Sequence, residues 1–500
     1  MSTNDSAIAW REWDAMAFAE AEVADKPILL AIGAVWCHWC HVMDSTSYHD
    51  PDVIATIAER YVPIRVDTDR RPDVNARYNL GGWPTTAILT PRGEPLTGGT
   101  YIPPVQLRAL LDEVATAYRE RKAEIASALA ERLQRRRDFA SAGGAELGPD
   151  IVETVLASIF ERYDAEYGGF GAEPKFPMTD VLEFLVLVYE RERDGRVGGM
   201  LSKTLLGMAG GGMYDHAEGG FFRYSTTRDW TIPHFEKMAE DHAGLLRAYA
   251  RAWRLLGIVP LRETLVSAVG YVRTVFRDPA TGLFAGSQDA DEAYYALPLE
   301  ARRERPAPFV DRTVYAGWNA GLASGLLAAA RALEDDAVGA DALVALDALH
   351  DRMRDDDGLL FHYMPPGDGP HVRGLLTDQA SYLRALLDAH EQSGEPRFRE
   401  RAADHARLIL ERFGSDGGAL VDAVPDEPLG RLEVPDRPLA ENSAVADALL
   451  RLSGTMGDER LGARARSILE SFAVRYPASG IFAAPYASAV SRALAGYAER

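Results

Sequence analysis

The pattern of apolar and polar positions divides the chain into two parts near residue 140. Before residue 104, short apolar runs separated by amphipathic stretches predict strands that alternate with helices, most clearly strands at 27–33, 61–67 and 85–89. Residues 106–137 then carry a helical spacing of apolar positions and end in a charged run. The small-residue, Gly-rich segment 139–149 is typical of a linker. We therefore expect one domain over 1–138 and a second over 150–500.

The second part has a helical period almost throughout. Amphipathic runs are expected at 151–163, 179–193, 199–210, 238–256, 261–276, 318–333, 340–354, 376–392, 395–413, 441–456, 462–475 and 487–498. Between alternate runs lie similar Gly-containing loops, at 167–170, 218–221, 281–284, 357–360, 416–419 and 479–482. This alternation favours a closed ring of six helical hairpins, an all-α (α/α)6 toroid, over an open array whose glycines only end helices.

The chain has only two cysteines, Cys37 and Cys40, and both follow the strand at 27–33 directly. A helix expected from Val42 onward places Cys37 near a helix N-terminus, where free N–H groups and the helix dipole favour a thiolate. A Cys-x-x-Cys pair after a strand is typical of a thioredoxin-like dithiol. Pro84, just before the strand at 85–89, matches the cis-proline that faces the dithiol in that fold. We expect residues 1–138 to form an α/β thioredoxin-like domain.

Two other chemistries fit the string Cys-His-Trp-Cys-His at 37–41. Its order is that of covalent haem attachment, which requires export, and residues 1–25 carry no apolar segment of the kind that exported chains have. Its sulfur and nitrogen atoms could also bind zinc, although so many ligands within five positions are crowded around one ion. The flanking strands favour the dithiol, with Cys37 attacking a disulfide and Cys40 resolving the product. The residues expected to shape this site are Trp36, His38, Trp39, His41 and Pro84.

Composition narrows the classes of partner. The formal net charge of −21 disfavours nucleic acid and anionic membrane surfaces. No apolar run approaches the roughly 18 residues of a membrane-spanning helix. The absence of an export signal and of further cysteines leads us to expect a cytoplasmic protein. The expected partners are a protein thiol client or a sugar-like ligand, and the sequence indicates no metal or cofactor and no oligomeric state.

The second part concentrates its chemically active residues between 210 and 242. Glycines there let the backbone approach a ligand, aromatic rings offer flat faces, and acids and histidines offer proton transfer, a mixture that suits a sugar pocket. His234 and Glu236 are candidate acid–base groups, and Glu236 or Asp241 could pair with Asp289 or Asp291 as glycoside hydrolysis requires. The same stretch could instead be a hydrogen-bonded helix start with a purely structural role. The full set of pocket candidates is Tyr214, Asp215, Arg223, Tyr224, Trp230, His234, Glu236, Asp241, Asp289, Asp291, Trp318, Asn319 and Asp378.

Several motifs resemble those of the spermatogenesis-associated protein 20 family. They are the strings at 37–43, 71–74, 81–84, 99–103, 168–171, 174–177, 214–215, 233–238, 289–291, 318–319 and 377–378. The resemblance covers nearly the whole chain and implies a thioredoxin-like domain joined to a six-hairpin, glycosidase-like barrel. It also implies similarity of that barrel to N-acylglucosamine 2-epimerases and related carbohydrate enzymes.

The chain departs from these patterns at a few positions. Gln288 stands where the family usually has an acid, and Ala31 stands where thioredoxins carry a buried Asp. His38 and Trp39 replace the Gly and Pro between thioredoxin's cysteines. We therefore expect a thiol–disulfide redox protein that the usual thioredoxin reductase does not serve. The alternative is a sugar epimerase or glycoside hydrolase acting in the barrel, with a structural or regulatory thioredoxin domain.

Overall fold

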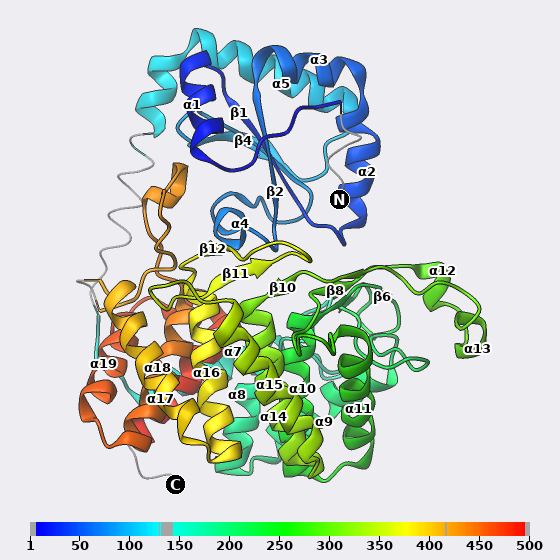
Figure 1. Ribbon diagram of the computed structural model, residues 1–500, viewed down its shortest axis with the longest axis vertical. Coiled ribbons are helices and arrows are strands. Elements are labelled where there is room, and N and C mark those ends of the chain that lie inside the picture. The colour runs from blue at the N-terminus through cyan, green and yellow to red at the C-terminus, as the bar shows by residue number, and fades with distance from the viewer. Residues whose placement is uncertain (1–6, 130, 132–143, 416–417, 496–500) are drawn as a thin grey trace. The chain divides into compact units, whose positions relative to one another are not determined.

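A computed structural model describes residues 7–129, 131, 144–415 and 418–495 (Figure 1). The chain divides into two compact units. Unit 1 contains residues 1–142 and 425–435, and unit 2 contains residues 143–424 and 436–500. Part of the predicted linker, residues 139–143, lies outside the described residues. No helix in the described ranges is both long enough and apolar enough to cross a bilayer.

Unit 1 is built on a four-stranded sheet with the order β2-β1-β3-β4. The strands are β1 (Ile28–Gly33), β2 (Val62–Asp67), β3 (Thr85–Leu89) and β4 (Pro95–Gly99). β1 runs parallel to β2 and antiparallel to β3, and β3 runs antiparallel to β4. The central strand β1 is apolar at nearly every position because both faces of the sheet are covered. The three strands predicted from the sequence are confirmed.

Successive residues of β1 enter two different cores, as the alternation of a strand requires. Ile28, Leu30 and Ile32 pack with side chains of α1 (Ala15–Ala24) and α4 (Pro72–Tyr78). Leu29 and Ala31 pack with α3 (Pro51–Arg60) and α5 (Pro104–Glu120) on the opposite face. Full burial of each large aliphatic side chain stabilises the fold by about 1.5–3 kcal/mol. The continuous helix predicted over 106–137 is wrong at Arg121, where φ and ψ of −125° and 31° end α5.

Residues 425–435 belong to unit 1 although they lie between α17 (Pro396–Arg412) and α18 (Leu439–Met456) in the chain. Leu432 is buried in the same core as Tyr78. The Tyr78 hydroxyl donates to the Gly93 carbonyl at 2.7 Å and accepts the Arg431 N–H at 2.8 Å. A Cβ atom at Gly93 would lie 2.6 Å from the Cα atom of Gly430, so the close approach requires glycine there. The sequence alone did not indicate this packing.

Unit 2 is a closed (α/α)6 toroid, as predicted. Its inner helices each pack against the next, and the last packs against the first: α8 (Thr179–Glu192), α10 (Ala239–Leu256), α14 (Ala316–Leu333), α16 (Leu376–Ser393), α18 (Leu439–Met456) and α20 (Ala484–Ala495). An outer helix packs against each of them: α7 (Pro149–Arg162), α9 (Gly195–Gly210), α11 (Val259–Tyr271), α15 (Asp336–Arg352), α17 (Pro396–Arg412) and α19 (Glu459–Glu470). Each outer helix precedes an inner helix in the chain, so the inner helices run parallel and their N-termini share one end of the ring.

Short elements complete the two units. The short strands are β5 (Tyr224–Ser225), β6 (Pro233–His234), β7 (Lys237–Met238), β8 (Ser287–Gln288), β9 (Val310–Asp311), β10 (Val314–Tyr315), β11 (Phe361–Met364) and β12 (His371–Arg373). They form the sheets β5-β6, β7-β8-β9 and β10-β11-β12. The short helices are α2 (His38–Ser45), α12 (Glu292–Tyr295), α13 (Leu299–Arg302), the 3₁₀ turns Ser47–His49, Gly430–Glu433 and Tyr476–Ala483, and the π-turn Val272–Phe276.

The recurring Gly loops join outer helices to inner helices through a shared set of hydrogen bonds. In the second loop, the Gly219 N–H donates to the Asp215 carbonyl and the Asp215 N–H donates to the Gly220 carbonyl. The loops at 164–169 and 278–283 repeat this pair of bonds. The next backbone N–H then donates to the side chain of the fourth residue of the following inner helix. These bonds are Phe221 to His242 (2.9 Å), Phe284 to Asn319 (2.7 Å), Leu360 to Gln379 (3.0 Å) and Leu420 to Asn442 (2.6 Å).

Candidate functional site

The cysteine pair of unit 1 stands at the start of α2. Cys37 is the N-cap residue, and its Sγ accepts the Cys40 N–H at 3.2 Å. The two cysteines are disulfide-bonded, and the residues are only 5% and 6% exposed. The Trp83–Pro84 peptide bond is cis and leads directly into β3. The predicted positions of the pair at a helix start and of a cis-proline before a strand are therefore confirmed.

Aromatic side chains surround the disulfide. The Trp36 indole N–H donates to Asp69 at 2.7 Å, and its ring meets the Trp83 ring edge-on at 5.7 Å. Trp39 is 53% exposed and lies against Tyr101. A buried disulfide thus borders a surface that presents a large exposed indole.

The imidazole rings of His38 and His41 are exposed to solvent on α2. Within the described part of the chain, no three His, Cys, Asp or Glu side chains are grouped so that they could hold one metal ion. In this disulfide-bonded form, the four side chains considered as zinc ligands, Cys37, His38, Cys40 and His41, therefore do not form a group that could hold one ion. At the end of β1, Gly33 leaves room for the inner sulfur, because a Cβ atom there would lie 3.3 Å from the Sγ of Cys40.

In unit 2, carboxylates gather at the shared end of the inner helices. Asp180 of α8, Glu240 and Asp241 of α10, and Glu441 of α18 all lie in the first turn of their helices. Negative charge is favourable there because helix N-termini carry partial positive charge. The surrounding protein reduces the solvation of these groups and raises the pKa of all four carboxyls, although Asp180 and Glu240 remain exposed at this end of the ring.

Five of the sequence-predicted pocket residues come together beside these acids. Arg223 donates its backbone N–H to the Glu236 carbonyl, and Tyr224 stacks on His234 with ring centres 4.9 Å apart. The His234 Nδ1 atom pairs with the Glu236 carboxylate. The charges of Arg223 and Glu236 also act on Asp241. The structure therefore assembles Arg223, Tyr224, His234, Glu236 and Asp241 into one cluster, called the barrel cluster below.

Two oxygen atoms of the barrel cluster are buried without a hydrogen-bond partner among the residues that the structure describes. They are Oε1 of Glu236 and Oδ2 of Asp241. Burial raises the pKa of Asp241 to about 7, the positive charge of Arg223 opposes the rise, and the carboxylates of Glu240 and Glu236 add to it. A carboxyl with such a pKa can both take up and release a proton near neutral pH.

Two other predicted residues, Asp215 and Trp230, are buried and bound by protein groups that hold the fold together. Asp215 is buried between Lys237 and Arg302, with both nitrogen–oxygen distances 2.7 Å. Burial raises its pKa, but the charge of Lys237 and the hydrogen bonds from Arg302 outweigh that effect and leave the pKa below its usual value. Trp230 is buried and donates its indole N–H to the Tyr167 carbonyl.

Both the oxygen and the nitrogen of the Asn319 side-chain amide form hydrogen bonds with backbone groups. Its Oδ1 accepts the Phe284 N–H, and its Nδ2 donates to the carbonyls of Phe284 and Tyr315, both at 3.0 Å. The side chain is fully buried. Asn319 therefore joins a loop to α14.

The remaining candidates are placed as follows. Tyr214 is buried and packs edge-on against Phe221. Asp291 caps α12 by accepting the Tyr294 N–H at 2.9 Å, and Asp289 is partly exposed two residues earlier. Trp318 is partly exposed and packs against another ring of the same unit.

Asp378 links two elements at the same end of the ring. Its carboxylate accepts the Gly317 N–H at 2.9 Å and lies 2.9 Å from Nδ1 of His362.

Sequence inspection missed the first-turn acids Asp180, Glu240 and Glu441. It also missed Glu183, one turn further along α8, which is paired with Arg247 at 2.6 Å and with Arg384 at 2.5 Å. The available signal was an acid at the second or third position of several predicted inner helices. Such acids are common at helix starts, so only the ring shows that they meet.

The comparisons with known proteins agree with both units. Residues 1–136 match the Thioredox_DsbH family, described as a protein of unknown function, DUF255. Over 345 residues, 61% of this chain, the sequence is 34% identical to spermatogenesis-associated protein 20 of Homo sapiens. The matched stretch is 43% of that protein, so the chain spans less than half the length of this curated relative.

Solved structures resemble unit 2 in fold. A sugar epimerase from a ruminal bacterium gives a TM-score of 0.55 at 13% identity, covering 65% of this chain and 85% of its own. A GH76 α-mannanase of Bacteroides thetaiotaomicron gives a TM-score of 0.51 at 11% identity, covering 69% of this chain and 94% of its own. At such identities the likeness concerns fold alone. The chain is thus similar in sequence to spermatogenesis-associated protein 20, as its motifs indicated, and it carries a Thioredox_DsbH region followed by a toroid with the fold of sugar epimerases and glycoside hydrolases.

Proposed function

We propose that this protein carries out thiol–disulfide exchange through Cys37 and Cys40. The observation that supports the proposal most directly is the position of Cys37 as the N-cap of α2, with its sulfur accepting a backbone N–H. The helix N-terminus and that N–H both stabilise negative charge on the sulfur. The same arrangement therefore favours the reactive thiolate once the disulfide is reduced.

The exchange proceeds in two balanced steps. In the reducing direction, the Cys37 thiolate attacks a client disulfide, forms a mixed disulfide and expels one client thiolate. The Cys40 thiolate then attacks the Cys37 sulfur, expels the second client thiolate and leaves the Cys37–Cys40 disulfide. Two electrons pass from the protein to the client. In the oxidising direction, a client dithiol reverses both steps.

The surroundings of the pair suit a protein client. Trp39 presents an exposed indole beside the disulfide, and large aromatic side chains are enriched where proteins bind one another. The cis peptide at Pro84 shapes the loop that precedes β3. A client chain would lie across this surface to bring its sulfur to Cys37.

The test is the midpoint potential of the pair, measured by thiol trapping in defined glutathione and dithiothreitol buffers. We expect a reversible two-electron transition. A midpoint potential of about −270 mV would indicate a reductant comparable to thioredoxin. The Cys37→Ser variant, which cannot form the disulfide, is the control. Thiols that stay reduced across the whole range would refute the redox proposal.

For unit 2 we propose a second activity, acid–base chemistry on a sugar-like ligand. The supporting observation is the pair of unpartnered buried oxygens on Glu236 and Asp241. Buried polar atoms cost free energy unless a hydrogen bond satisfies them, and sugar hydroxyls would supply the missing donors. The stacked rings of Tyr224 and His234 offer a flat face for a sugar ring.

In this proposal Asp241 transfers the proton, because its pKa of about 7 allows both directions near neutral pH. Arg223 faces the same group and would stabilise negative charge that develops on a sugar oxygen. Glu236 would hold a hydroxyl through its unpartnered oxygen and orient His234 through the other.

A panel of aldoses incubated in D2O tests this second proposal. Proton NMR would detect deuterium entering the carbon next to the carbonyl, or new anomeric signals from epimerisation or hydrolysis. We expect Asp241→Asn to lose the reaction and Cys37→Ser to retain it. Turnover that survives in the Asp241→Asn variant would place the chemistry elsewhere.

A further inference from the structure

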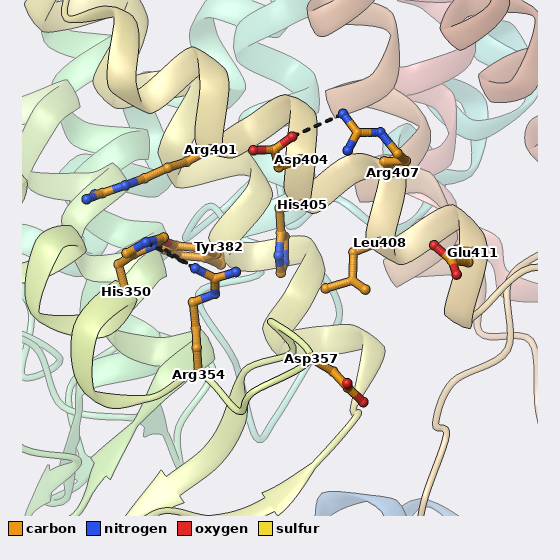
Figure 2. A pocket seen from close by; sticks show the side chains of 10 residues that line it. All are labelled: His350, Arg354, Asp357, Tyr382, Arg401, Asp404, His405, Arg407, Leu408 and Glu411. Atoms are coloured by element: carbon orange, nitrogen blue, oxygen red, sulfur yellow. Dashed lines mark hydrogen bonds and ion pairs between the residues drawn. The ribbon is translucent and has the colours of Figure 1, made fainter.

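A cavity of about 260 Å³ lies between α15, α16 and α17 (Figure 2). Two of these are outer helices, and none of the residues in the barrel cluster lines the cavity. Its inner part is formed by His350, Arg354, Tyr382 and His405, which Figure 2 shows gathered around the same space. The two activities proposed above make no use of these side chains.

His405 brings an unsatisfied acceptor to the cavity. The residue is 4% exposed, and no group in the described part of the chain forms a hydrogen bond with its buried Nε2 atom. Because a hydrogen bond between the ring and the backbone of Gln379 raises the pKa of His405, we assign the ring proton to Nδ1. Burial lowers the pKa of His405 to about 3, and the charge of Arg354 lowers it further, so the ring is neutral. Nε2 is therefore an unprotonated nitrogen that can accept a hydrogen bond from a ligand.

Arg354 brings a positive charge without a counter-ion. Its Nε donates to the Gly358 carbonyl at 3.1 Å, and its Nη1 lies 3.0 Å from His350. Among the described residues, Arg354 forms no ion pair. The other two arginines of the cavity are neutralised, Arg401 by Asp347 at 2.6 Å and Arg407 by an aspartate on the same helix.

Tyr382 and His350 are the other two polar side chains of the inner cavity. The Tyr382 hydroxyl lies 3.1 Å from Nδ1 of His350, which fixes that ring against α16. Burial lowers the pKa of His350, and the charges of Arg401 and Arg354 lower it further. The inner cavity therefore combines the unpaired charge of Arg354 with a buried histidine nitrogen, while the carboxylates of Asp357, Asp404 and Glu411 line the rest of the cavity.

We propose that this cavity binds the phosphate group of a small phosphorylated ligand. The oxygens of a phosphate accept hydrogen bonds from Arg354, and the P–OH group of a monoprotonated phosphate donates to Nε2 of His405. Sulfate has the same shape but carries no proton at neutral pH, so it cannot satisfy His405. The site therefore favours phosphate over sulfate. The volume lies just below the range of about 300–1,000 Å³ typical of small-molecule pockets, which suits a compact phosphomonoester.

Calorimetric titration of the full chain tests the proposal with four probes: inorganic phosphate, sodium sulfate, glucose 6-phosphate and glucose. We expect saturable binding of both phosphate probes, weaker binding of sulfate and none of glucose at this site. Binding of glucose 6-phosphate that is tighter than that of inorganic phosphate would identify an ester as the ligand. Equal binding would identify the free anion.

Two arginine variants distinguish a specific contact with phosphate from a general effect of positive charge on binding. Arg354→Met should weaken phosphate binding at least tenfold, and Arg407→Met, which removes a paired arginine from the same cavity, should leave it within twofold. His405→Leu should abolish the preference for phosphate over sulfate. If that variant does not fold, the preference in the unaltered chain still decides the role of His405. Failure of both phosphate probes to bind, equal affinity for sulfate and phosphate, or equal weakening by the two arginine variants would overturn the proposal.

Discussion

Replacing Asn319 by Leu should destabilise unit 2 without touching any proposed chemistry. Leucine has the same branched arrangement of four side-chain heavy atoms as asparagine, so the change creates no cavity, although its methyl groups need more room. It removes the acceptor of the Phe284 N–H and the donor to the Phe284 carbonyl, both in a buried loop. The substitution therefore isolates the contribution of the bonds between a loop and an inner helix.

The expected magnitude follows from the groups left unsatisfied. A buried N–H without a partner costs about 1–3 kcal/mol, and the carbonyl that loses its donor adds about 1 kcal/mol. The sum of about 2–4 kcal/mol is a large part of the 5–15 kcal/mol that stabilises a typical domain. The Asn442→Leu change removes the equivalent bonds at Leu420 and should cost a similar amount.

Urea unfolding measures the loss of stability, and hydrogen–deuterium exchange locates it. Asn319→Leu should release the Phe284 amide from protection and leave Leu420 protected, and Asn442→Leu should do the reverse. Each variant is thus the control for the other. A Phe284 amide that stays protected in Asn319→Leu, or a loss of stability below about 1 kcal/mol, would contradict the reasoning.

Three further predictions follow from the sites. The Cys40→Ser variant should accumulate a mixed disulfide between Cys37 and its client, visible by mass spectrometry as an adduct that dithiothreitol releases; a chain without adduct would show that Cys37 does not attack. Lys237→Met removes one of the two cations that pair with the buried Asp215, while Arg302 still pairs with it, and should lower the free energy of unfolding by about 1.5–3 kcal/mol in chemical denaturation. The pKa of Asp241 is about 7 in the fold and about 3.9 in an unfolded chain, so the folded state binds more protons between these values. Stability from this group is therefore full below about pH 4 and falls as the pH rises to about 7, and Asp241→Asn should flatten that part of a stability–pH curve.

The redox pair was within reach of sequence analysis because its geometry is local. A strand, two cysteines three residues apart and a helix follow one another without interruption, so Cys37 becomes an N-cap wherever the helix forms. The ring of hairpins was also predictable, because helical periodicity and the spacing of Gly loops repeat along the chain. The loops themselves were recognised, but their partners on the next inner helix were not.

The barrel cluster was predicted only in part, for a physical reason. Residue types that suit catalysis also suit buried hydrogen bonding, so Asp215 and Asn319 looked the same in the sequence as Glu236 and Asp241. The structure separates them by their partners: the first two are saturated by protein groups, and the last two keep an unpartnered oxygen.

The sequence by itself determined the elements, the order of the two folds and the place of the dithiol, since each depends on neighbours within a few residues. Tertiary structure decided which acids meet at the inner-helix N-termini, why Leu432 packs in the core of unit 1, and where Arg354 and His405 come together. These contacts join residues tens to hundreds of positions apart. They form because closing the ring and burying both faces of the sheet remove apolar surface from water, and no local pattern records which polar groups are then carried into contact.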